Sequence, residues 1–338
     1  MMGQLAVIVP VASFEPLSVI KRSVDCILDL QNGDLDVRVV YVLDMIAKED
    51  EADDRLKFLE DAPVSVIARK DNRGRRAGAV NDALATFASY EKTPDYIALF
   101  DVDSRPEQNF LVECVSALRS NQDAIIASSA RFITNADESI VTKTIAAEYF
   151  FFSDVYRTFR RLDGFNQFNG LIGVLNMKLM ERHRFNRLNE SVSCEDLDFT
   201  QKSYLAGLTG VFTPKTMVGE QAPAGLSDLF NQRVRWLAGA YQGLHTYLPS
   251  FMTSEIPMPR RLAWFLTLTL PFVAFLTTPI IPVYGLRLWG RFGIQRAIVQ
   301  TIGLTLHTWL ITLCGIVALR KQISGDGVEW KESVRSEV

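Results

Sequence analysis

The sequence has little of what metal clusters and disulfide-rich proteins are built from. Its 338 residues include only four cysteines and three histidines. The cysteines are scattered without a Cys-x-x-Cys pair, so we expect neither a zinc site nor a disulfide framework, and this usage fits a reducing compartment. His183, His245 and His307 stand alone, without partners at metal-ligand spacing, so each histidine is interpreted as structural.

Long blocks of one charge sign are also missing. The formal net charge is −3, and no run of Lys and Arg could neutralise a row of phosphates, which argues against a nucleic-acid-binding protein. Residues 10–16, PVASFEP, contain no glycine, so the glycine-rich phosphate loop expected of a nucleotidyltransferase is absent there. The first residues, MMGQLAVIVPV, have no basic segment and no small-residue cleavage site, and are expected to form structure, not a signal peptide.

The first half of the chain alternates between two kinds of segment. Short β-rich runs are separated by segments with helical periodicity, such as residues 16–30 and 76–90. This alternation is typical of a doubly wound, mostly parallel sheet with crossover helices, so the predicted fold class is α/β. The β-rich runs cover residues 5–11, 37–43, 64–68, 96–100 and 124–129.

Acidic residues stand where two of these strands would end. Asp44 follows VYVL, and Asp101 follows YIALF. Because ligands bind at the carboxyl ends of strands in such sheets, we expect both residues to share one crevice. In DVDS, Asp101 and Asp103 would point to the same side of extended chain and could hold Mg²⁺ or Mn²⁺, which in turn could bridge to a diphosphate. A solvated acidic turn is the alternative.

Two later motifs also carry chemistry. Glu195 and Asp196 lie at the expected start of a helix over residues 195–207, where acidic residues either serve the helix dipole or act as a general base on a hydroxyl. Gln232, Arg235 and Trp236 have the spacing QxxRW, which places them along one helix face. Such a stripe could clamp a phosphate and stack on a sugar, although a surface helix would explain it equally well.

Two long uncharged runs, residues 262–286 and 297–319, follow this region. Each exceeds the ~20 residues that a helix needs to cross a bilayer, so we predict membrane segments and keep buried core helices as the alternative. Pro271, Pro279 and Pro282 interrupt the first run, which leaves both a span and a re-entrant path open. The predicted organisation is a catalytic domain over 1–250, membrane segments over 251–321 and a polar tail over 322–338.

From Leu5 to about Gln242 the chain resembles the family 2 glycosyltransferases of GT-A fold. The closest likeness is to the QxxRW branch, which includes cellulose, chitin and hyaluronan synthases and ceramide glucosyltransferase. The motifs occur in family order: VIVPV, Asp44, GRRAGAVNDAL, DVDS, FNGLIGV, CEDLDF, GEQAP and QRVRW.

The resemblance implies an activity and a location. The protein would be a membrane-attached inverting transferase that uses a nucleotide sugar, expected to be a UDP-sugar, and forms a β-glycoside on a lipid-linked or saccharide acceptor. Its catalytic domain would face the cytoplasm.

The resemblance also implies roles for single residues. Asp196, beside Glu195, would be the catalytic base, and Asp103 with Asp101 would hold Mg²⁺ or Mn²⁺. Arg76 stands where relatives commonly have Lys, which is not equivalent in geometry. The implied donor-binding residues are Asp44, Arg76, Gly78, Asn81, Asp101, Gln232, Arg235 and Trp236, and the implied acceptor-side residues are Phe168, Asn169, Gly170 and Trp236.

Three alternative functions remain open from the sequence. A processive polysaccharide synthase would need to enclose its product, and two C-terminal segments would require membrane partner subunits or a homo-oligomer for this. A nucleotidyltransferase would also use metal-binding carboxylates on an α/β sheet. A non-catalytic nucleotide-sugar-binding scaffold would not need the proposed base, Asp196.

Overall fold

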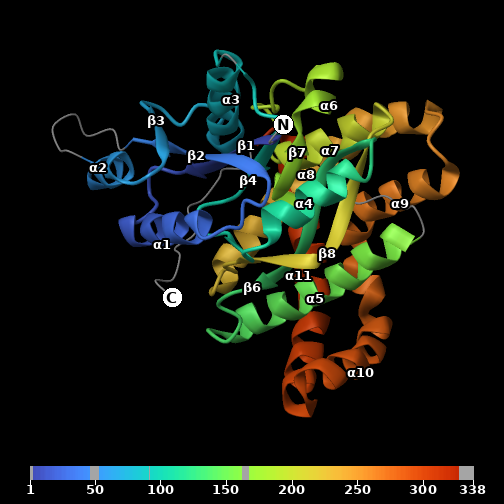
Figure 1. Ribbon diagram of the computed structural model, residues 1–338. Coiled ribbons are helices and arrows are strands. Elements are labelled where there is room, and N and C mark those ends of the chain that lie inside the picture. Colours follow the sequence, from blue (N-terminus) through green and yellow to red (C-terminus); the bar gives the residue numbers. More distant parts are fainter. Residues whose placement is uncertain (1–2, 46–52, 91, 162–166, 327–338) are drawn as a thin grey trace.

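The computed structural model describes residues 3–45, 53–90, 92–161 and 167–326 (Figure 1). Within these ranges the strands form an eight-stranded sheet in the order β3-β2-β1-β4-β7-β6-β8-β5. The strands are β1 (Gly3–Val11), β2 (Leu35–Asp44), β3 (Ser65–Arg69), β4 (Tyr96–Leu99), β5 (Arg105–Pro106), β6 (Ala124–Ile133), β7 (Gly173–Asn176) and β8 (Thr209–Glu220). All five β-rich runs of the sequence are therefore confirmed as strands.

The sheet is mixed. Strands β1 to β4 pair in parallel, as do β6 and β8. Strand β7 runs antiparallel to both β4 and β6, and β5 runs antiparallel to β8. The predicted α/β class is correct, and the antiparallel β7 joins the parallel half of the sheet, which ends at β4, to the β6–β8 pair.

Helices cover both faces of the sheet because alternate strand residues point to opposite sides. Val7 and Val9 pack with α1 (Leu17–Leu28), α2 (Asp54–Asp61) and α4 (Phe110–Arg119). Ile8 packs with the opposite set, α3 (Arg75–Ala88), α6 (Met177–Arg182) and α7 (Glu195–Leu205). Figure 1 shows α1 and α3 on opposite sides of the sheet. The carboxyl ends of β1, β2 and β4 therefore lie between the helices that cover the two faces of the sheet.

The long helix α8 (Leu226–Thr253) lies tightly on α7. A Cβ at Gly239 would lie 2.6 Å from the sulfur of Cys194, and one at Gly243 would lie 2.4 Å from Leu197. Small residues four apart on a helix let two backbones approach closely. This contact brings the predicted QxxRW stripe of α8 next to the acidic start of α7.

The C-terminal part of the chain is helical and apolar. Helices α9 (Met258–Thr269) and α10 (Ile281–Phe292) flank the 3₁₀ segment η2 (Leu270–Ile280), and α11 (Ile294–Ser324) follows. The 35 residues of Met258–Phe292 and the 31 residues of α11 are both long and apolar enough to cross a bilayer, judged by length and composition. The first of these segments is bent, because Pro279 lies inside η2 and Val273 has non-helical backbone angles.

The helix α5 (Ile140–Arg161) connects the sheet to this apolar part. Ala147 of α5 packs with Ile281, Leu304 and neighbouring residues of α10 and α11. Ile145 of α5 packs instead with Ile133 at the end of β6 and Leu229 of α8. In Figure 1, α5 runs between β6 of the sheet and α10.

Candidate active site

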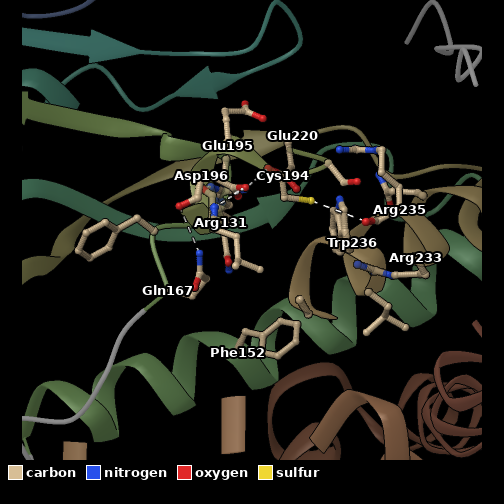
Figure 2. Close-up of a pocket in the computed structure, with 18 of the residues that line it drawn as sticks. Arg131, Phe152, Gln167, Cys194, Glu195, Asp196, Glu220, Arg233, Arg235 and Trp236 are labelled. Atoms are coloured by element: carbon tan, nitrogen blue, oxygen red, sulfur yellow. Dashed lines mark hydrogen bonds and ion pairs between the residues drawn. The ribbon is translucent and has the colours of Figure 1, made fainter. Parts of the chain in front are cut away.

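A cavity of about 1880 Å³ lies at the carboxyl ends of β1, β2 and β4 and continues to the apolar helices. Asp44, Asp101 and Asp103 line it at the strand ends, as the sequence predicts. The other predicted residues in its wall are Arg76, Phe168, Asn169, Gly170, Glu195, Asp196, Gln232, Arg235 and Trp236. Figure 2 shows the acidic start of α7 and the Arg235–Trp236 pair facing the same space.

The guanidinium of Arg76 joins three segments of the cavity wall. Its Nε donates to Asp101 Oδ1 at 2.6 Å, and one terminal nitrogen donates to Glu195 Oε1 at 2.9 Å. The other terminal nitrogen donates to the backbone carbonyl of Gly170 at 2.6 Å. Burial alone would lower the pKa of Arg76, but the two carboxylates raise it above its usual value. A lysine at this position could not bridge three acceptors with the same planar geometry.

Asp196 is held by backbone donors. The Gly170 N–H donates to Asp196 Oδ2 at 2.5 Å, and the Leu197 N–H donates to Oδ1 at 2.8 Å. Gly170 has a φ of +60°, a conformation that favours glycine, and this turn aims its N–H at the carboxylate. Burial, together with the charge of Glu195, raises the pKa of Asp196 above its usual value. A carboxylate tuned in this way and facing a cavity can accept a proton from a hydroxyl.

A second charged network holds the same loop from the other side. Arg131, on β6, donates to Glu220 Oε2 at 3.0 Å and also to the carbonyl of Asn169. The hydroxyl of Tyr149, on α5, donates to the other oxygen of Glu220. Burial raises the pKa of Glu220; Arg131 opposes this, whereas Asp103 and Asp101 act in the same direction as burial.

Sequence reasoning missed this network. Glu220 belongs to the GEQAP motif but had no predicted role, and Arg131 and Tyr149 lie in no motif. The one sequence signal for this network is that Glu220 lies in the GEQAP motif, which could have marked it as a candidate site residue.

The other end of the cavity is formed around Asp44. Its Oδ1 accepts from Arg69 at 2.7 Å, and Arg69 also donates to Asp82 at 2.8 Å. Burial raises the pKa of Asp44, and Arg69 opposes that effect. Residues 72–74, between β3 and α3, and Arg75 at the start of α3 line the cavity beside it.

Gly78 and Asn81 do not belong to the residues that line the cavity. The Asn81 amide donates to the carbonyl of Leu188 at 3.0 Å and to Glu190 at 2.8 Å, and its oxygen accepts from the Leu188 N–H at 2.7 Å. A Cβ at Gly78 would lie 1.9 Å from the Arg73 carbonyl. Gly78 therefore packs against the backbone at Arg73, and Asn81 holds the loop at Leu188 and Glu190. Direct contact of either residue with a donor stays a prediction.

Asp101 and Asp103 fit a metal ion that arrives with its ligand. The described residues contain no group of three or more His, Cys, Asp or Glu side chains suited to hold a metal ion by themselves. Mg²⁺ in proteins is commonly held by one or two carboxylates, with substrate phosphates and water completing its coordination. Two carboxylates on the wall of an open cavity match that arrangement, and they do not match a preformed metal cage.

The QxxRW residues approach the site from α8. Gln232, Arg235 and Trp236 all line the cavity, as one helical stripe is expected to do. The thiol of Cys194, just before the acidic start of α7, lies 3.8 Å from the carbonyl of Arg235. Gln167 stands across the cavity from Trp236 in Figure 2, and its amide donates to the hydroxyl of Thr200 at 2.9 Å.

Comparison with curated proteins finds relatives that are named as probable mannosyltransferases. Over 174 residues the chain is 30% identical to "Probable glucomannan 4-beta-mannosyltransferase 1" of Arabidopsis thaliana, covering 51% of this chain and 31% of that protein. Over 253 residues it is 24% identical to "Probable glucomannan 4-beta-mannosyltransferase 7" of Oryza sativa subsp. japonica, covering 69% and 40%. The match to these two curated relatives thus spans well under half of their length.

Solved structures share the fold. The mannosyltransferase PcManGT from Pyrobaculum calidifontis, in complex with GDP-Man and Mn²⁺, superposes with a TM-score of 0.62 at 17% identity, covering 96% of this chain and 88% of that one. The S. aureus protein TarS gives a TM-score of 0.52 at 14% identity, covering 96% and 54%. These identities support a shared GT-A fold and nothing finer.

Family models match most of the chain. The model described as "Glycosyl transferase family 2" matches residues 7–182, and the one described as "Glycosyl transferase family group 2" matches residues 96–319. Together they include the strand-end carboxylates, the acidic start of α7 and the QxxRW stripe. The resemblance seen in the sequence is confirmed: this chain belongs to glycosyltransferase family 2.

Proposed function

We propose that the protein is a membrane-attached inverting glycosyltransferase that moves a sugar from a nucleotide-sugar donor to an acceptor hydroxyl. The observation that carries the proposal is the contact set of Arg76. This one guanidinium ties the DVDS segment, through Asp101, to the start of α7, through Glu195. The base candidate Asp196 and the candidate metal ligand Asp103 consequently face one cavity.

The proposed reaction is a single displacement. Asp196 takes the proton of an acceptor hydroxyl while that oxygen attacks the anomeric carbon, and the nucleoside diphosphate leaves from the opposite side. Gln232 and Arg235 bind the diphosphate, since a guanidinium can form two hydrogen bonds to phosphate oxygens. A divalent cation bound at Asp103 and Asp101 would offset the negative charge on the departing diphosphate. From an α-linked donor this displacement gives a β-glycoside.

The donor is proposed to be a mannosyl nucleotide. The curated relatives are named as probable mannosyltransferases, and the PcManGT structure contains GDP-Man and Mn²⁺. These names favour GDP-mannose over the UDP-sugar that the sequence resemblance predicts. A UDP-sugar stays the second donor to test, because the sequence resemblance implies it.

The acceptor is proposed to be lipid-linked. The cavity that contains Asp196 and Trp236 continues along Leu266, Pro271 and Ile311 of the apolar helices. A continuous path from charged to apolar walls suits an acceptor with a polar head and a hydrocarbon tail. Residues 1–250 are proposed to form the catalytic domain on the cytoplasmic side, and residues 251–321 to attach it to the membrane.

A processive synthase is the second candidate. The relatives' names as probable glucomannan 4-beta-mannosyltransferases favour growth of a saccharide chain. The two candidate spans, Met258–Phe292 and Ile294–Ser324, could not by themselves enclose a hydrophilic polymer against lipid. This candidate therefore requires partner subunits or further copies of the chain, and it predicts long products only in such an assembly.

The first prediction concerns the proposed base. Asp196→Asn keeps the size of the side chain but removes its ability to take a proton, so kcat is expected to fall at least about 10²-fold with donor KM nearly unchanged. Asp198→Asn is the matched control, because Asp198 lies on the same helix but contacts Tyr247 and Lys202. The activities of both variants are measured by the release of nucleoside diphosphate. Loss of donor binding in Asp196→Asn would reassign Asp196 to the nucleotide site.

A second prediction follows from the raised pKa of Asp196. Only the ionised carboxylate accepts a proton, so activity is present above this pKa and is lost as the pH falls through it. Because the pKa is raised, the midpoint of the fall in kcat/KM is expected to lie above the ordinary aspartate value of about 3.9. A pH profile of kcat/KM measures the midpoint, and a midpoint at or below the ordinary value contradicts this assignment.

The third prediction tests the metal and the donor together. With Mn²⁺ present, GDP-mannose is expected to be turned over faster than UDP-glucose, and EDTA is expected to stop turnover. Asp103→Asn should abolish both turnover and the metal-dependent part of GDP binding, since a neutral amide replaces a charged oxygen ligand. Asp36→Asn, an exposed change on β2, is the control. Full activity in EDTA would remove the metal from the mechanism.

A further inference from the structure

A set of buried charged side chains lies in the cavity wall where α5, α8 and α11 meet. It consists of Glu148 on α5, Arg233 on α8 and His307 on α11, which are 8%, 2% and 7% exposed. A terminal nitrogen of Arg233 donates to Glu148 Oε2 at 2.5 Å. His307 Nε2 lies 3.1 Å from Glu148 Oε1, at ion-pair distance, although the contact is not aligned as a hydrogen bond.

Arg233 also supports the indole of Trp236. Its guanidinium carbon lies 4.1 Å from the centre of the Trp236 ring, the arrangement of a cation–π contact. The Nε of Arg233 has no hydrogen-bond acceptor among the described residues. The guanidinium is therefore held at one end by Glu148 and lies against the ring of Trp236, so its position and that of the indole depend on each other.

The charge of Arg233 is compensated by Glu148. Burial alone would raise the pKa of Glu148, but Arg233 and His307 outweigh burial and lower it to about 2. Glu148 is thus ionised at physiological pH. Removing one partner of a buried ion pair leaves the other charge uncompensated in a medium that solvates it poorly, so Arg233 has a strong reason to stay beside Glu148.

Helix α11 packs closely on other helices both before and after His307, and this packing fixes the position of His307. A Cβ at Gly303 would lie 2.2 Å from the Thr144 hydroxyl of α5. Further along, the thiol of Cys314 lies 3.8 Å from the Phe230 carbonyl of α8. An ionisable residue on a membrane helix is costly unless it faces a partner. The sequence predicts His307 to be structural, whereas here it meets a carboxylate that holds an arginine of the QRVRW segment.

We propose that Glu148 and His307 are positioning residues for the acceptor subsite, which hold Arg233 against Trp236 and so couple that indole to the seating of α11. The proposal rests on the proposed function in placing the acceptor at Trp236. In this proposal α11 does more than attach the protein to the membrane. The contact of His307 with Glu148 would fix the position of the Trp236 ring, on which the acceptor sugar stacks. A purely structural ion pair would instead affect stability, donor binding and turnover together.

The first test observes Trp236 directly and needs no acceptor. The full chain is labelled with 5-fluorotryptophan in lipid nanodiscs, and the ¹⁹F resonance of Trp236 is assigned with Trp236→Phe. In His307→Leu and Glu148→Gln this resonance is expected to shift or broaden, while the Trp264 resonance stays in place. His307→Gln keeps a polar side chain that can donate to Glu148, so it is expected to bring the Trp236 resonance back toward its position in the unmodified protein.

The matched control is His245→Leu. His245 is exposed on α8 and stacks on Tyr241, so the same chemical change there should leave the Trp236 resonance unmoved. A Trp236 resonance that stays unchanged in both His307→Leu and Glu148→Gln overturns the proposal. Binding of GDP with Mn²⁺ shows that each variant is folded, and its loss in every variant at residues 148 and 307 would mark the cluster as structural only.

The second test separates acceptor binding from donor binding. With octyl β-mannoside and β-1,4-mannotetraose as acceptor probes, His307→Leu is expected to raise acceptor KM about tenfold, within the range of a desolvated cation–π contact. The kcat and the Kd for GDP with Mn²⁺ should stay within about twofold. Equal losses in kcat and GDP affinity would overturn the positioning role.

A double-mutant cycle with Trp236→Ala tests the acceptor site at Trp236 separately from the coupling of His307 to Trp236. If the residues are coupled, His307→Leu should add little to acceptor KM once Trp236 is gone. If Trp236→Ala leaves acceptor KM unchanged, the proposed acceptor site is wrong, while the ¹⁹F measurement still decides the coupling. If Trp236→Ala raises acceptor KM and His307→Leu adds its full effect to that, the coupling is wrong and the acceptor site stands.

Discussion

The three-way contact of Arg76 is the interaction on which the rest of the site depends. Its guanidinium binds Asp101 after β4, Glu195 at the start of α7 and the carbonyl of Gly170. The same Gly170 presents its N–H to Asp196. A planar group with several donors in fixed directions can set the relative positions of three segments. The candidate metal ligands and the candidate base therefore keep their spacing without help from a bound ligand.

Helix α5 extends this organisation toward the apolar helices, because two consecutive residues on it serve two networks. Tyr149 binds Glu220, which holds Arg131 and, through it, the loop at Asn169. Glu148 binds Arg233 and meets His307 of α11. One rigid helix thus contacts both the wall around the carboxylates and the support of Trp236. A shift of α11 against α5 would change the position of Glu148 and Arg233, and with them that of the QxxRW stripe. The proposed membrane attachment could change the site through these contacts.

The sequence predicted what depends on local pattern and missed what depends on distant partners. Strand periodicity and the rule on strand ends located Asp44, Asp101 and Asp103, and helical spacing located the stripe of Trp236. The antiparallel β7 is only four residues long, too short to give a periodic signal. Arg131, Glu148 and His307 each meet partners far away in the chain, which no spacing rule can reveal. Gly78 and Asn81 were assigned to the donor by likeness of motif, and this stays a prediction: Gly78 packs against the Arg73 carbonyl, and Asn81 binds Leu188 and Glu190.

The positions of Arg76, Asp103 and Asp196 relative to the donor can be tested with an experimental structure of the full chain bound to GDP and Mn²⁺. We predict that the diphosphate lies between Asp103 and Arg235, with the metal ion at Asp103. Arg76 should still join Glu195 to the Gly170 carbonyl, and Asp196 should still accept the Gly170 N–H while facing the open side of the cavity. A diphosphate bound away from Asp103, or an Arg76 side chain released from both Glu195 and Gly170, would contradict the account.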